Sequence, residues 1–320
     1  MKTTVLLTGG TGYVGGRIAR RLMCRDDVKL LIGARQKGGL MSSWLDNDMV
    51  VPLEITSNKS LETACSGVDC VVHLAALNEI DSAADPEQAL LINGLGTLKL
   101  LQASEKAGVR RFIYFSTAHV YGSPLSGVIT EKTLARPVHP YAITHRIAED
   151  FVLASHDRKL LTGIVIRLSN SFGAPADRQV KRWTLLINDL CRQVVETGCL
   201  TLSSSGMQRR DFIPLEDVAG AVEHLLFLHR DLCGDGLFNL GGASSLRVID
   251  VAERVAGRCQ DVLGFLPEIR RPQPGGSDVC AALEFNIDKL MATGFSLSGN
   301  MDQEIDSTLL FCQQVFGGKQ

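Results

Sequence analysis

Three glycines near the start of the chain have the spacing of a loop that binds phosphate groups. The segment TGGTGYVG at positions 8–15 follows a short apolar run and precedes a helical pattern over 16–24. In such a loop one glycine permits the tight turn, a second lets the backbone approach a pyrophosphate, and a third allows close helix–sheet contact. The first N–H groups of the helix would hold the phosphates. The residues expected to bind a dinucleotide here are Gly9, Gly12, Tyr13 and Val14.

A basic position about 20 residues after the loop bears on the kind of dinucleotide. An acidic residue at this place normally binds the 2′-hydroxyl of the adenosine ribose. The chain instead reads Gly33-Ala34-Arg35-Gln36-Lys37. Arg35, helped by Lys37, could pair with a 2′-phosphate. The sequence therefore favours NADP, with NAD as the alternative if both cations are only solvated loop residues.

Short apolar runs alternate with helical patterns over the first half of the chain, which is typical of βαβ units. The expected strands span 4–7, 29–32, 50–53, 70–74, 111–115 and 163–166, and two longer helical patterns span 86–107 and 141–154. We predict an α/β fold: a Rossmann doubly wound parallel sheet with helices on both faces and a smaller C-terminal α/β substrate lobe. Residues 1–168 would bind the dinucleotide. Residues 169–320 would mainly form the substrate-binding lobe, with some segments returning to the Rossmann core.

The composition excludes several classes of protein. The 320 residues have a formal net charge of −2, and the charges are interspersed, so we expect neither a nucleic-acid nor a membrane partner. The amino terminus is too briefly apolar for a signal peptide, and the sequence lacks a membrane span, so we expect a cytoplasmic protein. Nine cysteines lack a C-x-x-C pair and the histidines lack ligand spacing, so no metal is expected.

Seven short segments further along the chain form an ordered set. They are HLAA at 73–76, NGLGT at 93–97, FSTAHVYG at 115–122, PYA at 140–142, RLSNSFG at 167–173, RDFI at 210–213 and DKL at 288–290. Together they resemble the extended short-chain dehydrogenase/reductase family, the nucleotide-sugar epimerases, dehydratases and 4-ketoreductases. The likeness covers nearly the whole chain. It implies an NAD(P)-dependent enzyme that reduces or epimerises a nucleotide-diphosphate sugar.

The resemblance also implies roles for individual residues. Tyr141 would deliver or accept a proton at the substrate carbonyl while hydride moves to or from the nicotinamide, and Thr117 would orient the same oxygen. The pKa of Tyr141, ordinarily about 10, would have to be lowered for it to act as a base near neutral pH. The further residues implied at the cofactor are Leu74, Ala75, Ala76, Asn93, Ser116, Tyr141 and His145. The residues implied at the substrate are Thr117, His119, Asn170, Arg210 and Arg271.

One residue departs from the family's Tyr-x-x-x-Lys pattern. His145 stands four residues after Tyr141, on the same helix face, where the lysine would hold the nicotinamide ribose and lower the tyrosine pKa. Histidine is shorter and mostly neutral at pH 7. Three interpretations stay open. His145 is a working catalytic variant that hydrogen-bonds the ribose and is charged by the cofactor phosphates and Tyr141. Alternatively it marks a degraded site that binds cofactor without efficient turnover, or it is an uninvolved helix residue.

The choice of reaction rests on the residues after Thr117. A dehydratase usually carries an Asp-Glu pair there, and this chain has Ala118 and His119, so we disfavour a 4,6-dehydratase and expect a reductase or an epimerase. A different class stays open because the lysine is missing: a non-catalytic dinucleotide-binding sensor or scaffold.

Arg210 would contact the substrate diphosphate, unless it only pairs with Asp211 or Glu216. The helices around positions 93 and 141 resemble those through which family members dimerise, so a homodimer is expected.

Overall fold

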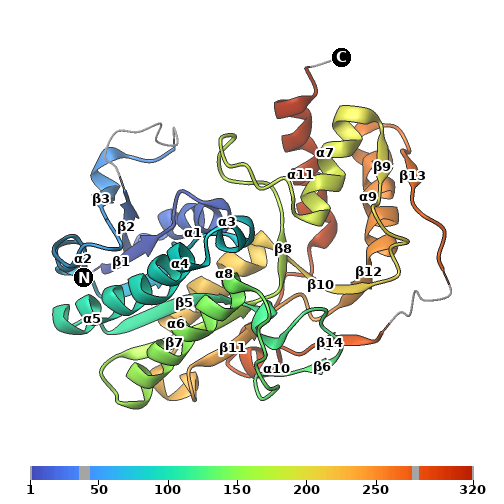
Figure 1. Cartoon of the computed structure of the whole chain (residues 1–320). Helices are drawn as coiled ribbons and strands as arrows, with labels where there is room; N and C mark the ends of the chain where they lie inside the picture. Colours follow the sequence, from blue (N-terminus) through green and yellow to red (C-terminus); the bar gives the residue numbers. More distant parts are fainter. Residues whose placement is uncertain (1, 36–43, 276–280, 319–320) are drawn as a thin grey trace.

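The computed structural model describes residues 2–35, 44–275 and 281–318, and a seven-stranded parallel sheet forms its core (Figure 1). The strands are β1 (Thr3–Thr8), β2 (Val28–Ala34), β3 (Val50–Pro52), β4 (Cys70–His73), β5 (Arg111–Thr117), β7 (Thr162–Leu168) and β11 (Leu237–Leu240). Their order across the sheet is β3-β2-β1-β4-β5-β7-β11. The direction of winding changes between β1 and β4. A crevice at the carboxyl ends of these two strands is where open α/β sheets bind ligands.

Helices cover both faces of this sheet because side chains alternate along each strand. On β1, Val5 and Leu7 pack into one core with the helices α1 and α8, whereas Leu6 packs into a second core with α2, α5 and α6. Each of these strand side chains is fully buried. The covering helices are α1 (Tyr13–Met23), α2 (Asn58–Cys65), α5 (Thr97–Ala107), α6 (Pro140–Asp157) and α8 (Leu215–Phe227).

A smaller lobe lies beside the carboxyl edge of the sheet, on the right in Figure 1. Its core packs Phe172 against Leu190, Val255 and Leu309, one residue from each of its three long helices. The elements of this lobe are β8 (Asn170–Phe172), α7 (Leu186–Thr197), β9 (Cys199–Thr201), β10 (Arg209–Pro214), β12 (Ser245–Arg247), α9 (Val248–Leu263), β13 (Glu268–Arg270) and α11 (Met301–Phe316). Strand β10 pairs with β8 and β12, and β9 pairs with β13.

Short elements complete the chain between these layers. Two small strands, at 127–129 and 283–285, pair in parallel, and the 3₁₀ helices of the described residues span 47–49, 118–121 and 230–233. The remaining elements are α3 (Glu79–Ala84), α4 (Pro86–Ala89), a π-helix (Leu90–Gly96), β6 (Gly127–Ile129), β14 (Leu283–Phe285) and α10 (Asp288–Met291). No helix in the described ranges combines the length and apolarity that crossing a membrane requires.

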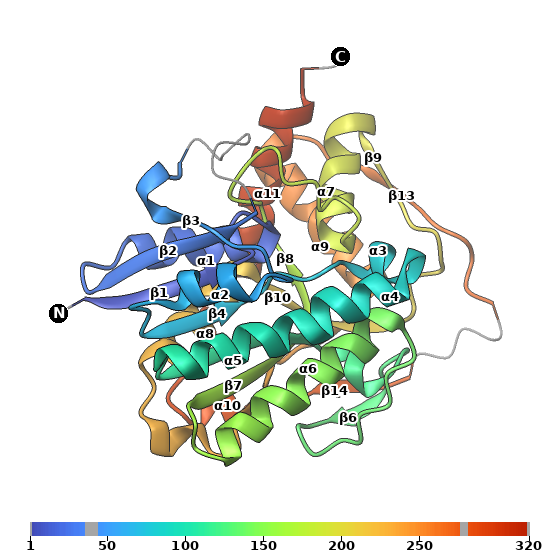
Figure 2. The same cartoon turned by 60° about the vertical axis from the view of Figure 1, so that its left-hand side comes forward.

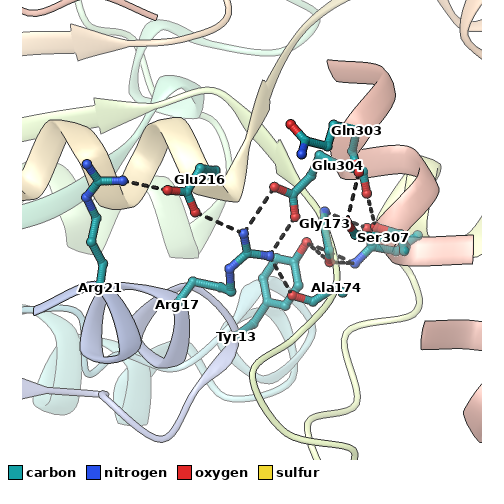
Figure 3. A network of polar contacts seen from close by, with 11 residues as sticks. Tyr13, Arg17, Arg21, Gly173, Ala174, Glu216, Gln303, Glu304 and Ser307 are labelled. Atoms are coloured by element: carbon teal, nitrogen blue, oxygen red, sulfur yellow. Dashed lines mark hydrogen bonds and ion pairs between the residues drawn. The ribbon is translucent and has the colours of Figure 1, made fainter. Parts of the chain in front are cut away.

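A polar network joins the first helix to the lobe (Figure 3). Arg17 of α1 donates to both carboxylate oxygens of Glu304 in α11, at 2.6 and 3.1 Å, and also contacts Glu216 of α8 at 3.3 Å. The Tyr13 hydroxyl donates to the carbonyl of Gly173 at 3.0 Å. Gly173 has a φ of 143°, and a Cβ there would lie 2.2 Å from the Glu304 carboxylate. The helix after the glycine loop is thus held directly against the C-terminal helix.

The predicted fold class is confirmed, and the expected strands coincide with β1, β2, β3, β4, β5 and β7 to within a few residues. Two differences have physical causes. The first helix begins at Tyr13 instead of residue 16, because Gly15, which lacks a Cβ, can pack against the backbone of the loop. The helical pattern over 86–107 contains a π-helical stretch at 90–96, which places Asn93 toward α6.

Candidate active site

A cavity of about 430 Å³ opens at the carboxyl edge of the sheet, beside the change in winding between β1 and β4. The glycine loop lines this cavity together with the ends of β4, β5 and β7. The start of α6 and the loop before α7 complete the lining. The lining residues that the sequence had predicted are Gly9, Gly12, Tyr13, Val14, Leu74, Ala75, Ala76, Ser116, Thr117, His119, Tyr141, His145 and Asn170. The fold therefore brings most of the predicted residues together.

The glycine loop forms a tight cradle under this cavity. The N–H of Gly12 donates to the carbonyl of Gly9 at 2.9 Å, and a Cβ on Gly15 would lie 2.2 Å from that same carbonyl oxygen. Only glycine fits such a close approach of two backbone segments. No described side chain caps the start of α1, so its leading N–H groups face the cavity without a side-chain partner. Such a helix start binds anions.

The first turn of α6 presents Tyr141 and His145 to the cavity. Pro140 occupies the first position of the helix, where its missing N–H costs nothing, and His139 accepts a hydrogen bond from the N–H of Tyr141 at 3.2 Å. The rings of Tyr141 and His145 meet edge to face, with centroids 4.3 Å apart. Desolvation at the cavity wall raises the pKa of Tyr141 above its ordinary value. The phenol therefore stays protonated here.

His145 is a buried residue with one bonded and one open ring nitrogen. Its side chain is 3% exposed, and Nδ1 lies 2.6 Å from the hydroxyl of Tyr114 on β5. Its Nε2 is buried and lacks a hydrogen-bond partner among the described residues. Burial lowers the pKa of His145 to about 4, so the ring is neutral near pH 7. The interpretation that cofactor phosphates and Tyr141 charge His145 stays a prediction.

Of the next two predicted residues, Asn93 lies behind the cavity wall and Thr117 lines the cavity. Asn93 accepts a hydrogen bond from the N–H of Leu77 at 2.8 Å and donates to Thr144 of α6 at 3.1 Å, so it ties the loop after β4 to the helix of Tyr141. Asn93 does not line the cavity, and its contact with the cofactor stays a prediction. The hydroxyl of Thr117 accepts from the N–H of His119 at 3.2 Å and lies on the lining.

Ser116 rests on a buried ion pair. Its hydroxyl donates to Glu149 at 2.5 Å, and Arg167 donates to the same carboxylate at 3.0 and 2.7 Å. Glu149 is fully buried and Arg167 is 1% exposed. Removing one partner of such a pair typically costs about 3–5 kcal/mol. The pair therefore fixes β5, β7 and α6 relative to one another beneath the cavity.

A second ion pair lines the cavity and was missed by the sequence analysis. Arg182, in the loop before α7, donates to both oxygens of Glu79 at 2.9 and 3.2 Å. Although burial opposes it, the charge of Arg182 lowers the pKa of Glu79. Glu79 follows the HLAA segment by three residues, which was a usable signal. Arg182 lies in an irregular loop without a motif, so only the fold reveals it.

Three predicted arginines lie outside the cavity lining. Arg35 is exposed at the end of β2, and Lys37, its expected helper, lies outside the described residues. Arg210 is exposed on β10, and its charge adds to the burial that lowers the pKa of His119, although Glu79 opposes this. Arg271 donates to the carbonyl of Ser205 at 2.6 Å.

The carboxylates that could have paired with Arg210 are engaged elsewhere. Asp211 accepts from the hydroxyl of Ser169 at 2.5 Å, and Glu216 contacts Arg17 and Arg21 of α1. Within the described part of the chain we find no hydrogen bond or ion pair made by the Arg210 guanidinium. The described residues thus show no pair of Arg210 with Asp211 or Glu216, and its contact with a diphosphate stays a prediction.

Comparison with protein families decides the family. The model of the NAD dependent epimerase/dehydratase family matches residues 5–241, which is most of the chain and includes the glycine loop, Thr117 and Tyr141. This chain belongs to that family. The matched range also includes His145, whose departure from a Tyr-x-x-x-Lys pattern stays a prediction.

Several relatives of this family member are similar over most of their length. A UDP-glucose 4-epimerase of Streptomyces lividans is 29% identical over 300 residues, covering 86% of this chain and 86% of that protein. A dTDP-glucose 4,6-dehydratase of Streptomyces niveus is 26% identical, covering 80% of this chain and 77% of the relative. The solved UDP-glucuronic acid 4-epimerase of Bacillus cereus, in complex with NAD, has a TM-score of 0.82 at 20% identity, with 99% of both chains covered. This last similarity concerns the fold.

The cavity of this epimerase/dehydratase family member has two features that fit a dinucleotide. The cradle at Gly9 and Gly15 leaves no room for a Cβ, which suits a backbone that must approach a pyrophosphate. The buried Nε2 of His145 has no partner in the described protein, and such a group normally finds one in a ligand or an ordered water.

Proposed function

We propose that this chain is an NADP-linked enzyme that reduces a keto group of a nucleotide-diphosphate sugar, or epimerises such a sugar through a keto intermediate. The observation that carries the proposal is that Tyr141 and Thr117 line the same cavity as the glycine loop. A bound nicotinamide would supply or accept hydride. Thr117 would then orient the substrate oxygen, and Tyr141 would exchange a proton with it.

The protonation of Tyr141 supports the reductive direction. Desolvation raises the pKa of this phenol, so it holds its proton at neutral pH and can give it to a carbonyl oxygen that becomes a hydroxyl. Starting from the hydroxyl instead would require Tyr141 as a base. No ammonium stands at position 145 to lower its pKa. Arg182, a cavity cation that lowers the pKa of Tyr141, is paired with Glu79, and burial outweighs it.

The residues that line the cavity disfavour a 4,6-dehydratase, although two of the similar proteins carry that name. Elimination of water needs an acid and a base beside the reacting carbons. Ala118 and His119 follow Thr117, and among the described lining residues Glu79 is the one carboxylate. Its ion pair with Arg182 leaves it poorly suited to give or take a proton. A reductase or an epimerase fits this cavity better.

The preference for NADP and for a substrate diphosphate rests on two arginines. Arg35 is exposed at the end of β2, where a 2′-phosphate would lie. Solved structures of similar fold contain either NADPH or NAD, so the cofactor preference belongs to this proposal. Arg210 stands near His119 without an acidic partner of its own and could clamp a diphosphate. Structures of similar fold hold UDP-sugars.

The decisive experiment measures turnover with a panel of substrates. The protein is incubated with NADPH and several 4-keto nucleotide sugars, and loss of reduced-cofactor absorbance is followed. Epimerisation is assayed separately by product analysis of UDP-sugars with added NAD or NADP. We expect oxidation of NADPH by at least one 4-keto sugar. Tyr141→Phe should bind NADPH normally and lower the rate by about 10²–10⁴-fold, the usual contribution of a positioned acid.

Two results would contradict the proposal in different ways. Tight binding of the dinucleotide without oxidation of NADPH and without any epimer would identify a non-catalytic binding protein. Elimination of water from a nucleoside diphosphate hexose would identify a dehydratase, in spite of Ala118 and His119.

A further inference from the structure

The hydrogen bond between Tyr114 and His145 lies directly behind the cavity. Tyr114 sits in the middle of β5, is 2% exposed, and places its hydroxyl 2.6 Å from Nδ1 of His145. The two rings are tilted by 34° with centroids 5.7 Å apart. The other ring nitrogen, Nε2, is buried and has no partner among the described residues, while the His145 side chain lines the cavity. The protein therefore holds the imidazole through Nδ1, and Nε2 is left for a ligand.

Burial determines how many protons Tyr114 and His145 carry. Burial raises the pKa of Tyr114 well above 10 and lowers that of His145 to about 4, so the phenol carries one proton and the neutral imidazole carries one. If the phenol donates to Nδ1, the ring proton must reside on Nε2. The backbone carbonyl of Phe115 raises the pKa of His145, but burial outweighs it.

The charged neighbours do not alter this assignment. Glu79 of α3 raises the pKa of His145, but burial dominates. His73 of β4 lies on the other side of Tyr114, and burial lowers its pKa to about 3, so it is also neutral. On α6 itself, Tyr141 is protonated and Glu149 is engaged by Arg167 and Ser116. No cation in the described surroundings competes for Nδ1.

We propose that Tyr114 is a positioning residue for His145. Its hydroxyl donates to Nδ1 and thereby fixes the tautomer in which Nε2–H points into the cavity and donates to a hydroxyl of the bound ligand. Where that ligand is the dinucleotide of the proposed function, the hydroxyl belongs to the nicotinamide ribose. The chain thus offers a neutral imidazole N–H, held in one orientation, at a position where a lysine would offer a flexible charged ammonium group. Burying a neutral imidazole also avoids the cost of burying an unpaired ammonium.

The tautomer can be read directly, without any assay of activity. Protein carrying ¹⁵N-histidine gives ring signals whose shifts distinguish the two neutral tautomers, and His145→Gln identifies the signals of His145. We expect the Nε2-protonated form in the wild type. In Tyr114→Phe both tautomers should be populated and the pKa of His145 should rise, because the donated bond that favours the neutral ring is gone. An Nδ1-protonated ring in the wild type, or unchanged signals in Tyr114→Phe, would overturn the proposal.

Tyr121→Phe is the matched control for this spectrum. Tyr121 is another buried tyrosine whose hydroxyl makes a hydrogen bond, to Asn239 at 2.7 Å, and it does not contact His145. The same loss of one oxygen there should leave the ring signals of His145 unchanged. A shift of equal size in both variants would show that removal of any buried hydroxyl disturbs the site, and the proposal would fail.

The contact between His145 and the ligand is tested by a double-mutant cycle of Tyr114 and His145, with NADP(H) affinity as the measurement. Tyr114→Phe should weaken NADP(H) binding by about 3- to 10-fold in the wild-type background, the range for one neutral hydrogen bond. In the His145→Gln background the same change should have no effect, because Tyr114 acts only through His145. Equal weakening in both backgrounds would indicate a structural role and overturn the contact. If no dinucleotide binds at all, the proposed function fails, while the spectrum still decides the tautomer.

Discussion

Arg35 is the residue on which the cofactor preference depends. It is exposed at the end of β2 and stands where an acidic residue would bind the adenosine ribose. Arg35→Asp should reverse the preference, so that NAD(H) binds more tightly than NADP(H). A charge-assisted hydrogen bond contributes about 1.5–3 kcal/mol, which predicts a loss of roughly 10- to 100-fold in NADP(H) affinity. Calorimetric titration with both cofactors measures this, and equal affinities in the wild type would rule the prediction out.

Arg210 carries the residue-level support for a diphosphate. Because Asp211 and Glu216 are engaged elsewhere, its guanidinium can donate two parallel hydrogen bonds to phosphate oxygens. Arg210→Ala should weaken binding of a nucleoside diphosphate by about 1.5–3 kcal/mol and leave NADP(H) affinity unchanged. Arg270→Ala is the control, because Arg270 is an exposed lobe arginine paired with Glu268. An unchanged affinity for UDP and dTDP in Arg210→Ala would remove this support.

Single residues show where sequence reasoning succeeds and where it ends. Tyr141, Thr117 and the glycines were found because each belongs to a local segment with a fixed spacing. Tyr114 was not found, because within β5 it reads as one more apolar position of a buried strand. Its role depends on His145, 31 residues away, and on which ring nitrogen faces the strand. No local pattern records such a pairing.

At the scale of elements, the turn from β1 into α1 depends on Gly15. A Cβ there would lie 2.2 Å from the carbonyl oxygen of Gly9, which is backbone and cannot swing away. Gly15→Ala should lower the free energy of unfolding by about 1–3 kcal/mol, the typical cost of overpacking. It should also abolish binding of the dinucleotide. Thermal unfolding and calorimetric titration measure the two effects.

Gly257 provides the matched control for Gly15. It lies inside α9, and a Cβ there would meet no atom within 4 Å. Gly257→Ala should stabilise the protein by about 0.5–1 kcal/mol, because alanine loses less backbone freedom in a helix. Equal stability of the two alanine variants would show that the close approach at Gly15 can relax.

The elements of the Rossmann half follow from periodicity, whereas those of the lobe do not. Long apolar runs flanked by helical patterns were enough to predict six strands of the main sheet. β11 has four residues and joins the sheet beside β7, and its pairing partner lies far back in the chain. The π-helix at 90–96 also left no mark on the pattern, because it arises where Asn93 must reach both Leu77 and Thr144.

At the scale of the whole molecule, the described residues expose an apolar face that we expect a second copy of the chain to cover. Figure 2 shows α5 and α6 side by side on one outer face, and the π-helix lies against α6. Large side chains on these helices remain 39–47% exposed: Leu90, Leu91, Leu95, Ile143 and Phe151. Large exposed apolar patches often mark interfaces. Phe151→Glu should therefore convert a homodimer into a monomer.

Light scattering after gel filtration gives the mass that tests the dimer. Leu310→Glu is the control, because Leu310 is 45% exposed on α11, a helix of the other lobe. It should leave the mass at twice that of one chain. A wild-type mass equal to one chain, or dimers in Phe151→Glu, would contradict the expected interface.

The place of β11 has a consequence for synthesis on the ribosome. When residue 168 has been made, β7 is a long apolar strand paired only with β5, and its free edge is a template for other chains. Strand β11, which covers this edge, is complete only after residues 169–240 have been made. This delay is about 4–15 s at typical rates of translation. A chain that ends at residue 168 should therefore pellet on centrifugation, whereas the full chain stays in the supernatant. We therefore expect a nascent chain to aggregate most readily during that interval, before β11 covers the edge of β7.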